Sequence, residues 1–353
     1  MQLTLHNQTY NAERFPELIR KKQAEQLPEW EEALFAFLAN WFDDGETISA
    51  QTSGSTGAPK PILLKKESML ASAKLTNLFF ELKAGDTALM CLSANYIAGK
   101  MMVVRAIAGG LNLIVVEPTT TPMIEQKIDF AAMVPMQVDS LLNTETGIAS
   151  LQNISKLIIG GSAVSSTLEE QLQSLSTKCY VTYGMTETVS HIALRSLNGE
   201  NKSNLYEAIL GVTFAQDHRD CLIINAPHLQ DEPFVTNDII SLKSNTSFEW
   251  LGRFDNVINS GGVKLFPETI EQKLSGTISE RFFISSRPDE KLGEKVVLVI
   301  ESTDFTKTKL DILNKKIEVL LSRFEKPREV IFLAQFTETT SGKIKRIFPP
   351  NEV

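Results

Sequence analysis

Over the middle of the chain, short apolar runs alternate with stretches in which apolar residues recur every three or four positions. The runs that predict buried strands are Thr87–Leu92, Leu111–Val116, Asp129–Val134 and Lys156–Ile159. The stretches between them that predict helices are Gly99–Ala108, Pro122–Lys127 and Ser165–Ser176. Alternating strands and helices are typical of βαβ units, so we expect an α/β fold with a mostly parallel sheet that is covered by helices on both faces.

Two further helices are expected before this region. The apolar residues between Trp30 and Trp41 recur at helical spacing and form one face, and a second helix is predicted over Ser68–Phe80. We expect the aromatic residues of the first helix to pack against the main domain.

After Tyr183 the pattern changes to short apolar runs that are separated by polar turns. These runs are His191–Arg195, Cys221–Asn225, Ile239–Leu242 and Phe248–Gly252. They predict a smaller antiparallel sheet within the same large domain.

A change in composition near Asp255 predicts a second domain. The elements expected beyond it are the helices Pro267–Leu274 and Lys307–Leu321 and the strands Arg281–Ser285, Val296–Ile300 and Glu329–Leu333. We therefore expect a large domain over residues 1–254 and a small α+β domain over residues 255–353, a length that suffices for an independent unit.

The composition is that of a globular protein. Of the 353 residues, 42% are hydrophobic and 22% are charged, and the formal net charge is −8. The chain has no block of basic residues, which argues against nucleic acid or a membrane surface as a partner. Cys91, Cys179 and Cys221 form no C-x-x-C pair, so neither a zinc site nor a disulfide framework is expected. With no signal-peptide pattern and no long apolar run, we expect a cytoplasmic protein, and homo-oligomerisation stays open.

The segment Gln51–Pro61 carries the strongest chemical signal. Its glycines permit a close approach to a ligand, and successive N–H groups in such a loop form an anion-binding concavity. Ser53, Ser55 and Thr56 add hydroxyl donors, and Lys60 adds a positive charge. We expect a polyphosphate-binding loop. The alternative is a mobile Ser/Gly linker, and the spacing does not fit a Walker A loop.

The pattern T-S-G-S-T-G-x-P-K in this segment resembles the phosphate loop of the adenylate-forming enzymes, which include acyl-CoA synthetases, non-ribosomal adenylation domains and luciferases. On this resemblance, the residues that hold the nucleotide are Thr52, Ser53, Gly54, Ser55, Thr56, Gly57 and Lys60. Because the loop lies so near the start of the sequence, the resemblance also implies that the N-terminal subdomain of such enzymes is shortened here.

A second motif, residues 183–187, follows a predicted strand, and strand ends are where open α/β sheets bind ligands. Tyr183 offers a flat face for a purine and Glu187 an oxygen ligand for Mg²⁺, although a helix cap explains the pattern equally well. The motif resembles the family's Y-G-x-T-E. This implies that Tyr183 and Gly184 contact the nucleotide, that Thr186 contacts phosphate and that Glu187 holds the metal.

Two more stretches resemble nucleotide contacts of the family. Gly160, Gly161 and Ser162 end another predicted strand and resemble its adenine wall, with a plain tight turn as an equal alternative. Residues 234–238 resemble the ribose motif Y-x-T-G-D, with phenylalanine in place of tyrosine and Asn237 in place of glycine. On this resemblance Asp238 accepts a ribose hydroxyl.

The C-terminal third contains the densest match. Residues 251–271 resemble the run G-R-x-D that precedes a glycine-rich turn and a helix in this family, whereas a loop that only caps that helix is the alternative. The resemblance implies that Arg253 reaches ribose or phosphate and that Asp255 is an interdomain hinge. It also implies that Gly261 and Gly262 line a tunnel for coenzyme A. Lys343, in Ser-Gly-Lys, resembles the lysine that enters the active site when the small domain closes.

The reaction implied is an ATP-dependent ligation with Mg²⁺ and coenzyme A as cofactors. A carboxylate attacks the α-phosphate of ATP to give an acyl-adenylate, and a thiol then displaces AMP. Residues 93–106 resemble the acyl-pocket segment of the o-succinylbenzoate–CoA ligases of menaquinone synthesis. The residues proposed to contact the acid are Tyr96, Gly99, Lys100, Arg105 and His191. The alternatives are another aryl- or fatty-acid–CoA ligase, a non-catalytic nucleotide-binding protein on this fold, and an Arg105 that pairs with a surface acid.

Overall fold

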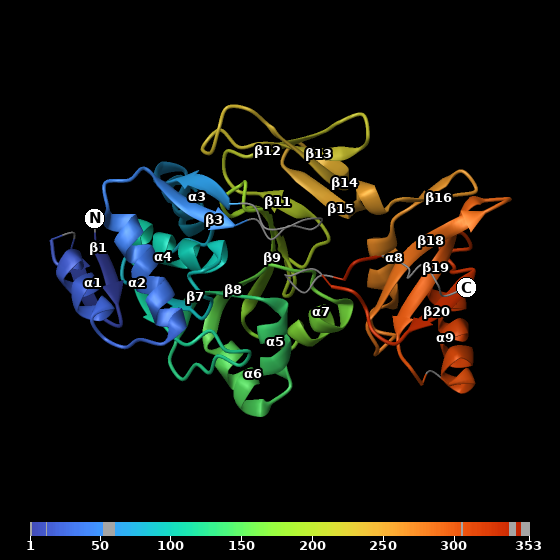
Figure 1. Ribbon diagram of the computed structural model, residues 1–353, viewed down its shortest axis with the longest axis horizontal. Helices are drawn as coiled ribbons and strands as arrows, with labels where there is room; N and C mark the ends of the chain where they lie inside the picture. Colours follow the sequence, from blue (N-terminus) through green and yellow to red (C-terminus); the bar gives the residue numbers. More distant parts are fainter. Residues whose placement is uncertain (1, 12, 52–60, 305, 339–343, 347–353) are drawn as a thin grey trace.

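The structure is a computed structural model that describes residues 2–11, 13–51, 61–304, 306–338 and 344–346. The strands at the centre of its main sheet are β5 (Thr87–Met90), β6 (Asn112–Val115), β7 (Ile128–Met133), β8 (Ile154–Ile159) and β9 (Lys178–Gly184). Each of these strands pairs in parallel with its neighbours within this set. The mixed α/β fold with a mainly parallel core is therefore confirmed (Figure 1).

Both faces of this central sheet are buried. In β5, Ala88 and Met90 belong to one apolar cluster, while Leu89 and the following Cys91 belong to another. Side chains alternate between the faces of a strand, so a strand that is covered twice is apolar throughout. The helices on the first face are α2 (Glu29–Phe42), α3 (Lys66–Phe79) and α4 (Ile97–Gly109), and those on the second are α5 (Pro135–Leu142), α6 (Glu145–Gln152) and α7 (Ser166–Leu172).

The predicted helix over Pro122–Lys127 is wrong, because these residues form an irregular connection before β7. Ile124 is the buried apolar residue of this stretch, and its backbone N–H and C=O bond to the Ser150 hydroxyl rather than to a helical neighbour. Helices α5 and α6, which lie between β7 and β8, were not predicted. Each has only eight residues, a length at which helical periodicity is hard to distinguish from other patterns.

The antiparallel part of the fold continues the main sheet instead of standing beside it. β10 (His191–Ser196) pairs antiparallel with β9, and the sheet then extends through β11 (Tyr206–Ala208), β15 (Ser247–Arg253), β14 (Phe234–Ser244), β13 (Cys221–Asn225) and β12 (Thr213–Gln216). At the opposite edge lie β1 (Gln2–Leu5) and β2 (Gln8–Asn11), which α1 (Phe15–Gln23) follows. A separate hairpin consists of β3 (Thr47–Gln51) and β4 (Pro61–Lys65).

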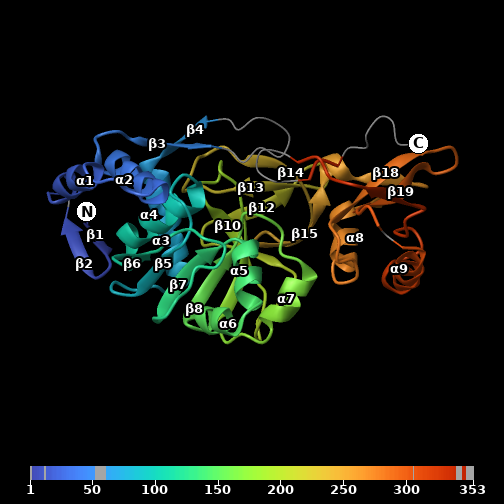
Figure 2. The ribbon, with the colours of Figure 1, turned by 60° about the horizontal axis from the view of Figure 1, so that its bottom comes forward.

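The described residues after the 3₁₀ turn η1 (Phe254–Asn256) build a second sheet with its own apolar clusters. Its strands are β16 (Ile258–Ser260), β17 (Val263–Leu265), β18 (Phe282–Asp289), β19 (Gly293–Glu301) and β20 (Glu329–Leu333), and its helices are α8 (Pro267–Leu274) and α9 (Lys307–Leu320). This lobe lies at the end of the molecule opposite β1 and β2 (Figures 1 and 2). Where the domain boundary falls, at Asp255 or elsewhere, stays a prediction.

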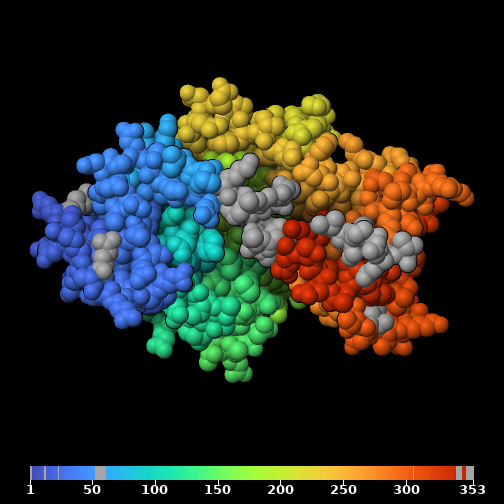
Figure 3. Space-filling model, in the orientation of Figure 1, coloured from blue at the N-terminus to red at the C-terminus, as the bar shows by residue number. Residues whose placement is uncertain are grey.

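In the space-filling view, the orange and red lobe adjoins the body at one end (Figure 3). Within the described segments, no helix is both long enough and apolar enough to span a membrane.

Candidate active site

A cleft of ≈ 1470 Å³ opens where the carboxyl ends of three parallel strands meet. Its lining includes Val134 after β7, Gly160 after β8 and Gly184 at the end of β9. Glu268 and Glu271 on α8 line it from the C-terminal lobe. Open α/β sheets bind ligands at this edge, so the cleft is the candidate active site.

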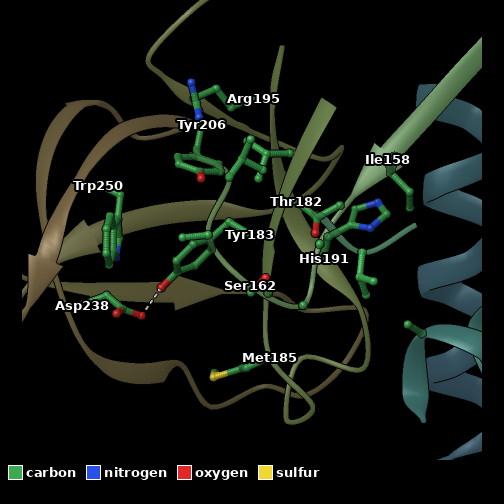
Figure 4. A pocket seen from close by; sticks show the side chains of 18 of the residues that line it. Ile158, Ser162, Thr182, Tyr183, Met185, His191, Arg195, Tyr206, Asp238 and Trp250 are labelled. Atoms are coloured by element: carbon green, nitrogen blue, oxygen red, sulfur yellow. Dashed lines mark hydrogen bonds between the residues drawn. The ribbon is translucent and has the colours of Figure 1, made fainter. Parts of the chain in front are cut away.

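Tyr183, Asp238 and Arg253 form one cluster in the cleft. The Tyr183 hydroxyl donates to Asp238 Oδ2 at 2.6 Å, and Arg253 Nη1 donates to Asp238 Oδ1 at 3.2 Å (Figure 4). Burial, followed by the nearby Asp238 carboxylate, raises the pKa of Tyr183 well above its ordinary value. The sequence assigned these residues to adenine, ribose and phosphate from three separate motifs, and the structure brings all three together.

The glycine-rich turn after β8 also faces the cleft, with Gly160, Gly161 and Ser162 in its lining. A Cβ atom at Gly160 would lie 2.2 Å from Thr182 Oγ1 on the neighbouring strand. Gly161 has a positive φ of +91°. Glycine is therefore favoured at both positions, once by a close approach to a side chain and once by the backbone conformation.

Thr186 and Glu187 lie in the tight turn between β9 and β10. The turn contains Val189 at φ 64°, a conformation that is strained for a β-branched residue. Thr188 Oγ1 accepts from the backbone N–H of Met185 at 3.0 Å and fixes the turn. Glu187 is exposed and lines the cleft, so its carboxylate is accessible from the cleft, and its role as a metal ligand stays a prediction. Among the described residues no cluster of three or more His, Cys, Asp or Glu side chains gathers, and Mg²⁺ beside phosphates needs only one or two carboxylates.

The other wall of the cleft comes from α4, where Ile97, Met101 and Arg105 lie one helical turn apart. Arg105 is only 2% exposed. Its Nη2 donates to Ser190 Oγ at 2.6 Å and its Nη1 contacts the thioether of Met102 at 3.5 Å. Its Nε has no hydrogen-bond partner within the described structure. Burial lowers the pKa of Arg105 to about 9.

Arg105 differs from the other arginines of the cleft. Arg195 pairs with Glu169, Arg253 pairs with Asp238, and Arg346 pairs with Glu271 and Glu268. For Arg105 no carboxylate lies within 4.0 Å anywhere in the described part of the chain, which leaves a buried guanidinium charge without an anion beside a cleft. The alternative that Arg105 points outward to a surface acid is thereby excluded for the described residues.

His191 lies at the start of β10, 4% exposed, and lines the same wall. Its Nε2 is 3.2 Å from Thr76 Oγ1 and its Nδ1 is 3.4 Å from Ser190 Oγ. Burial, and then the charge of Arg105, lower its pKa well below the ordinary value, so the ring is neutral at physiological pH. In Figure 4 it lies on the far side of Tyr183 from Asp238 and Trp250.

Three residues expected at the acid lie outside the lining of this cleft, and their role toward the acid stays a prediction. Tyr96 is 72% exposed at the start of α4. Lys100 instead donates to the backbone carbonyl of Ser49 on β3 at 2.9 Å, since it points to the hairpin side of its helix. Gly99 is buried, and a Cβ there would lie 2.2 Å from the Ser93 carbonyl oxygen, so its role is a close helix–loop contact.

Several predicted residues fall outside the described segments. They are Thr52, Ser53, Gly54, Ser55, Thr56, Gly57, Lys60 and Lys343. Gln51 and Pro61, which flank the first group, are paired across the β3–β4 hairpin. Gly261 and Gly262 form the turn between β16 and β17 at φ 58° and 82°, away from the cleft lining, and their role toward coenzyme A stays a prediction.

The cleft also contains residues that the motifs did not indicate, among them Ser190, Tyr206 and Trp250. Tyr206 and Trp250 lie in short antiparallel strands whose pattern indicates only burial. Ser190 directly precedes His191, which the sequence analysis names, but no motif indicates Ser190 itself.

The comparisons identify the family. The AMP-binding enzyme family matches residues 50–224. An acyl-CoA synthetase (AMP-forming)/AMP-acid ligase II-like protein from Dyadobacter fermentans is 36% identical, with a TM-score of 0.63, over 94% of this chain and 96% of that one. This chain belongs to the AMP-binding enzymes. The prediction of an AMP-forming acid–CoA ligase is confirmed at the level of this class, whose cofactors are ATP, Mg²⁺ and coenzyme A.

More distant relatives bear on the acid. The 2-succinylbenzoate–CoA ligase of Listeria monocytogenes is 24% identical over 84% of this chain and 68% of its own length. The corresponding Escherichia coli ligase is 24% identical over 88% of this chain and 69% of its own. An o-succinylbenzoate coenzyme A synthetase from Bacillus subtilis, solved with ATP and magnesium, has a TM-score of 0.66 at 17% identity, over 84% of this chain and 68% of its own, and shows the fold alone.

If Asp255 is the hinge, Asp255→Pro should suppress one half-reaction and spare the other, because proline fixes φ near −65°. Asp255 lies in η1, exposed, and its carboxylate is 3.7 Å from Arg253 Nη2. Acid-dependent pyrophosphate release and thiolation of supplied acyl-adenylate would be measured separately. Asp255→Ala is the control for loss of the carboxylate alone. Equal retention of both half-reactions in the proline variant would argue against a hinge here.

Proposed function

We propose that this protein ligates 2-succinylbenzoate to coenzyme A through an acyl-adenylate, as in menaquinone synthesis. The observation that carries the proposal is the buried Arg105 guanidinium, which lines the cleft and has no carboxylate partner among the described residues. 2-Succinylbenzoate has two carboxylates: one is activated, and the other needs a cation in the pocket. A charge left unpaired in such a site is costly, so substrate and pocket satisfy each other.

The remaining parts of the cleft suit the other reactants. Tyr183, Asp238 and Arg253 are proposed to hold the adenosine of ATP, and Glu187 is proposed as the protein ligand of Mg²⁺. The metal would neutralise phosphate charge while the first carboxylate attacks the α-phosphate. The chain's own contribution is the positioning of two anionic reactants that repel each other. The relatives named 2-succinylbenzoate–CoA ligases support this choice of acid, and an indoleacetate–CoA ligase at 24% identity marks the alternative.

Pyrophosphate release over a panel of acids tests the proposal. The panel contains 2-succinylbenzoate, its analogue without the second carboxylate, indoleacetate, benzoate and a fatty acid, each with ATP and Mg²⁺. We expect the highest kcat/KM with 2-succinylbenzoate and a clear loss with its mono-acid analogue. A preference for indoleacetate, benzoate or the fatty acid would overturn the choice of acid and leave the ligase class intact.

Asp238→Asn should raise the KM for ATP about tenfold, because a neutral amide weakens charge-assisted hydrogen bonds of the carboxylate. The KM for the acid should stay nearly unchanged, since Asp238 lies across Tyr183 from His191 (Figure 4). Asp231→Asn, at an exposed position outside the cleft lining, is the matched control. An unchanged KM for ATP in Asp238→Asn would contradict the assignment to the nucleotide.

A further inference from the structure

Four side chains, those of Arg105, Ser190, His191 and Thr76, form a series of hydrogen bonds that runs from the cleft into the core. We call this series the relay. Arg105 Nη2 lies 2.6 Å from Ser190 Oγ, and Ser190 Oγ lies 3.4 Å from His191 Nδ1. His191 Nε2 lies 3.2 Å from Thr76 Oγ1, which lies 3.1 Å from the Ser72 carbonyl oxygen. The four residues come from α4, the β9–β10 turn, β10 and α3.

The donor and the acceptor of every hydrogen bond in the relay follow from the chemistry of its two end residues, Thr76 and Arg105. At the inner end, the single hydroxyl proton of Thr76 is donated to the Ser72 carbonyl, so Thr76 Oγ1 can only accept from His191 Nε2–H. Nδ1 of a neutral imidazole is then an acceptor and takes the hydroxyl proton of Ser190. At the outer end, Ser190 Oγ accepts from Arg105, which has no acceptor of its own.

We propose that Ser190, His191 and Thr76 are positioning residues that hold the Arg105 guanidinium against the cleft wall and so determine the preference for an acid with a second carboxylate. The inference rests on the proposed function, because Arg105 is there the partner of that carboxylate. Nη2 is held by Ser190, Nη1 contacts a thioether, and the guanidinium carbon lies 6.0 Å from the centroid of the Phe130 ring. Nε is buried, so the donors left for a substrate are the free protons of the two terminal nitrogens.

Contacts of the surrounding backbone keep the relay in place. Thr76 is fully buried on α3, and the next residue, Asn77, donates to the Arg105 carbonyl oxygen at 2.9 Å. Two consecutive residues of α3 therefore hold the backbone and, through the relay, the side chain of Arg105. Across the sheet, a Cβ atom on Gly184 would lie 2.5 Å from the Ser190 carbonyl oxygen, so the glycine of the nucleotide motif also permits the position of Ser190.

The relay also excludes a second positive charge from this wall. Protonation of His191 would turn Nδ1 into a donor, so the Ser190 hydroxyl proton would lose its acceptor, and two cations would lie beside each other. The charged or titratable groups that meet at this point are Arg105 and His191 themselves. The wall consequently carries one fixed positive charge, which matches one carboxylate.

The relay is tested by the kinetics of paired variants, in which one variant removes a hydroxyl and the other keeps it. Ser190→Ala should raise the KM for 2-succinylbenzoate about tenfold, the typical cost of losing a hydrogen bond to a charged group, with kcat and the KM for ATP nearly unchanged. Ser190→Thr, which keeps the hydroxyl, should restore the KM. Thr76→Val should act in the same direction and Thr76→Ser should rescue it. Ser174→Ala, an exposed serine outside the cleft, is the control. An unchanged KM in Ser190→Ala, or a loss shared equally by Ser190→Thr, would overturn the relay.

A second readout does not depend on the acid. Long-range ¹⁵N–¹H spectra of the full chain resolve the ring nitrogens of its four histidines, and His191→Phe assigns the signal. We expect a neutral His191 ring with its proton on Nε2 in the wild type, and a shift of the proton toward Nδ1 in Thr76→Val. A ring protonated on Nδ1, or on both nitrogens, at neutral pH would overturn the relay. If the wild type rejects 2-succinylbenzoate, the proposed function fails alone, and this tautomer then decides the relay.

Discussion

Arg105→Met should raise the KM for 2-succinylbenzoate about 100-fold or more and leave the KM for ATP nearly unchanged. Removal of one partner from a buried charge pair typically costs about 3–5 kcal/mol, and each 1.4 kcal/mol corresponds to about tenfold in affinity. Methionine keeps much of the volume of the arginine side chain, so the cavity term that an alanine would introduce stays small. The change in the KM for 2-succinylbenzoate in Arg105→Met therefore measures the loss of the positive charge.

The same variant makes a prediction for stability that separates charge loss from misfolding. In the free enzyme, Arg105 is buried and, within the described residues, lacks an anion, so removal of its charge relieves a desolvation cost. The melting temperature of Arg105→Met should be equal to that of the wild type or higher. The preference for 2-succinylbenzoate over its mono-acid analogue should also disappear. Arg105→Lys keeps a positive charge but lacks the planar guanidinium, so its preference for 2-succinylbenzoate should lie between those of the wild type and Arg105→Met.

A wild-type KM for 2-succinylbenzoate in Arg105→Met would contradict the pairing. A fall in melting temperature together with a rise in the KM for ATP would mean that Arg105 supports the fold rather than the acid. Thermal unfolding with and without each ligand distinguishes these results, because a ligand stabilises only the state that binds it.

How far the sequence predicts this fold depends on how each element is buried. β5 to β8 are covered on both faces and therefore appear as continuous apolar runs, which is why they were predicted within two residues at either end. The stretch Pro122–Lys127 contains an apolar residue, Ile124, that a side-chain hydroxyl from another element holds in place. A local pattern contains no information on such a partner.

For the candidate site, too, the sequence predicts some residues and not others. Tyr183, Asp238 and Arg253 could be assigned because each lies in a motif with a recognisable spacing, and the structure brings them into contact. The relay could not be assigned, because Thr76 and His191 are separated by 115 positions and neither lies in a motif that mentions the other. Lys100 was also proposed to contact the acid, and it donates instead to the carbonyl of Ser49 on a different element, a partner that a local pattern does not indicate.

Lys343→Ala should reduce acid-dependent pyrophosphate release by about 10²–10³-fold, the typical effect of losing one oriented donor at a developing oxyanion. Lys343 lies outside the described residues, so the prediction rests on the Ser-Gly-Lys motif together with the anchoring of its neighbours. Glu338 and Ile344, on either side of the motif, form a β-bridge with each other. Arg346 lines the cleft and donates to Glu271 Oε2 on α8 at 2.8 Å. Ile344 and Arg346, which follow Lys343 closely, are thus held in place by described partners, and Arg346 lies beside the candidate active site.

The control for Lys343 is a neighbour of the same chemistry. Lys345 is exposed, and its backbone N–H donates to the Thr337 carbonyl at 2.8 Å, a bond that an alanine would keep. Lys345→Ala should therefore retain pyrophosphate release, while Lys343→Ala loses it. In Lys343→Ala, conversion of supplied acyl-adenylate to the thioester should persist, because the motif's resemblance assigns the lysine to the step in which negative charge develops on the α-phosphate and not to the attack of the thiol. Normal pyrophosphate release in this variant, or equal losses in the two lysine variants, would contradict the assignment.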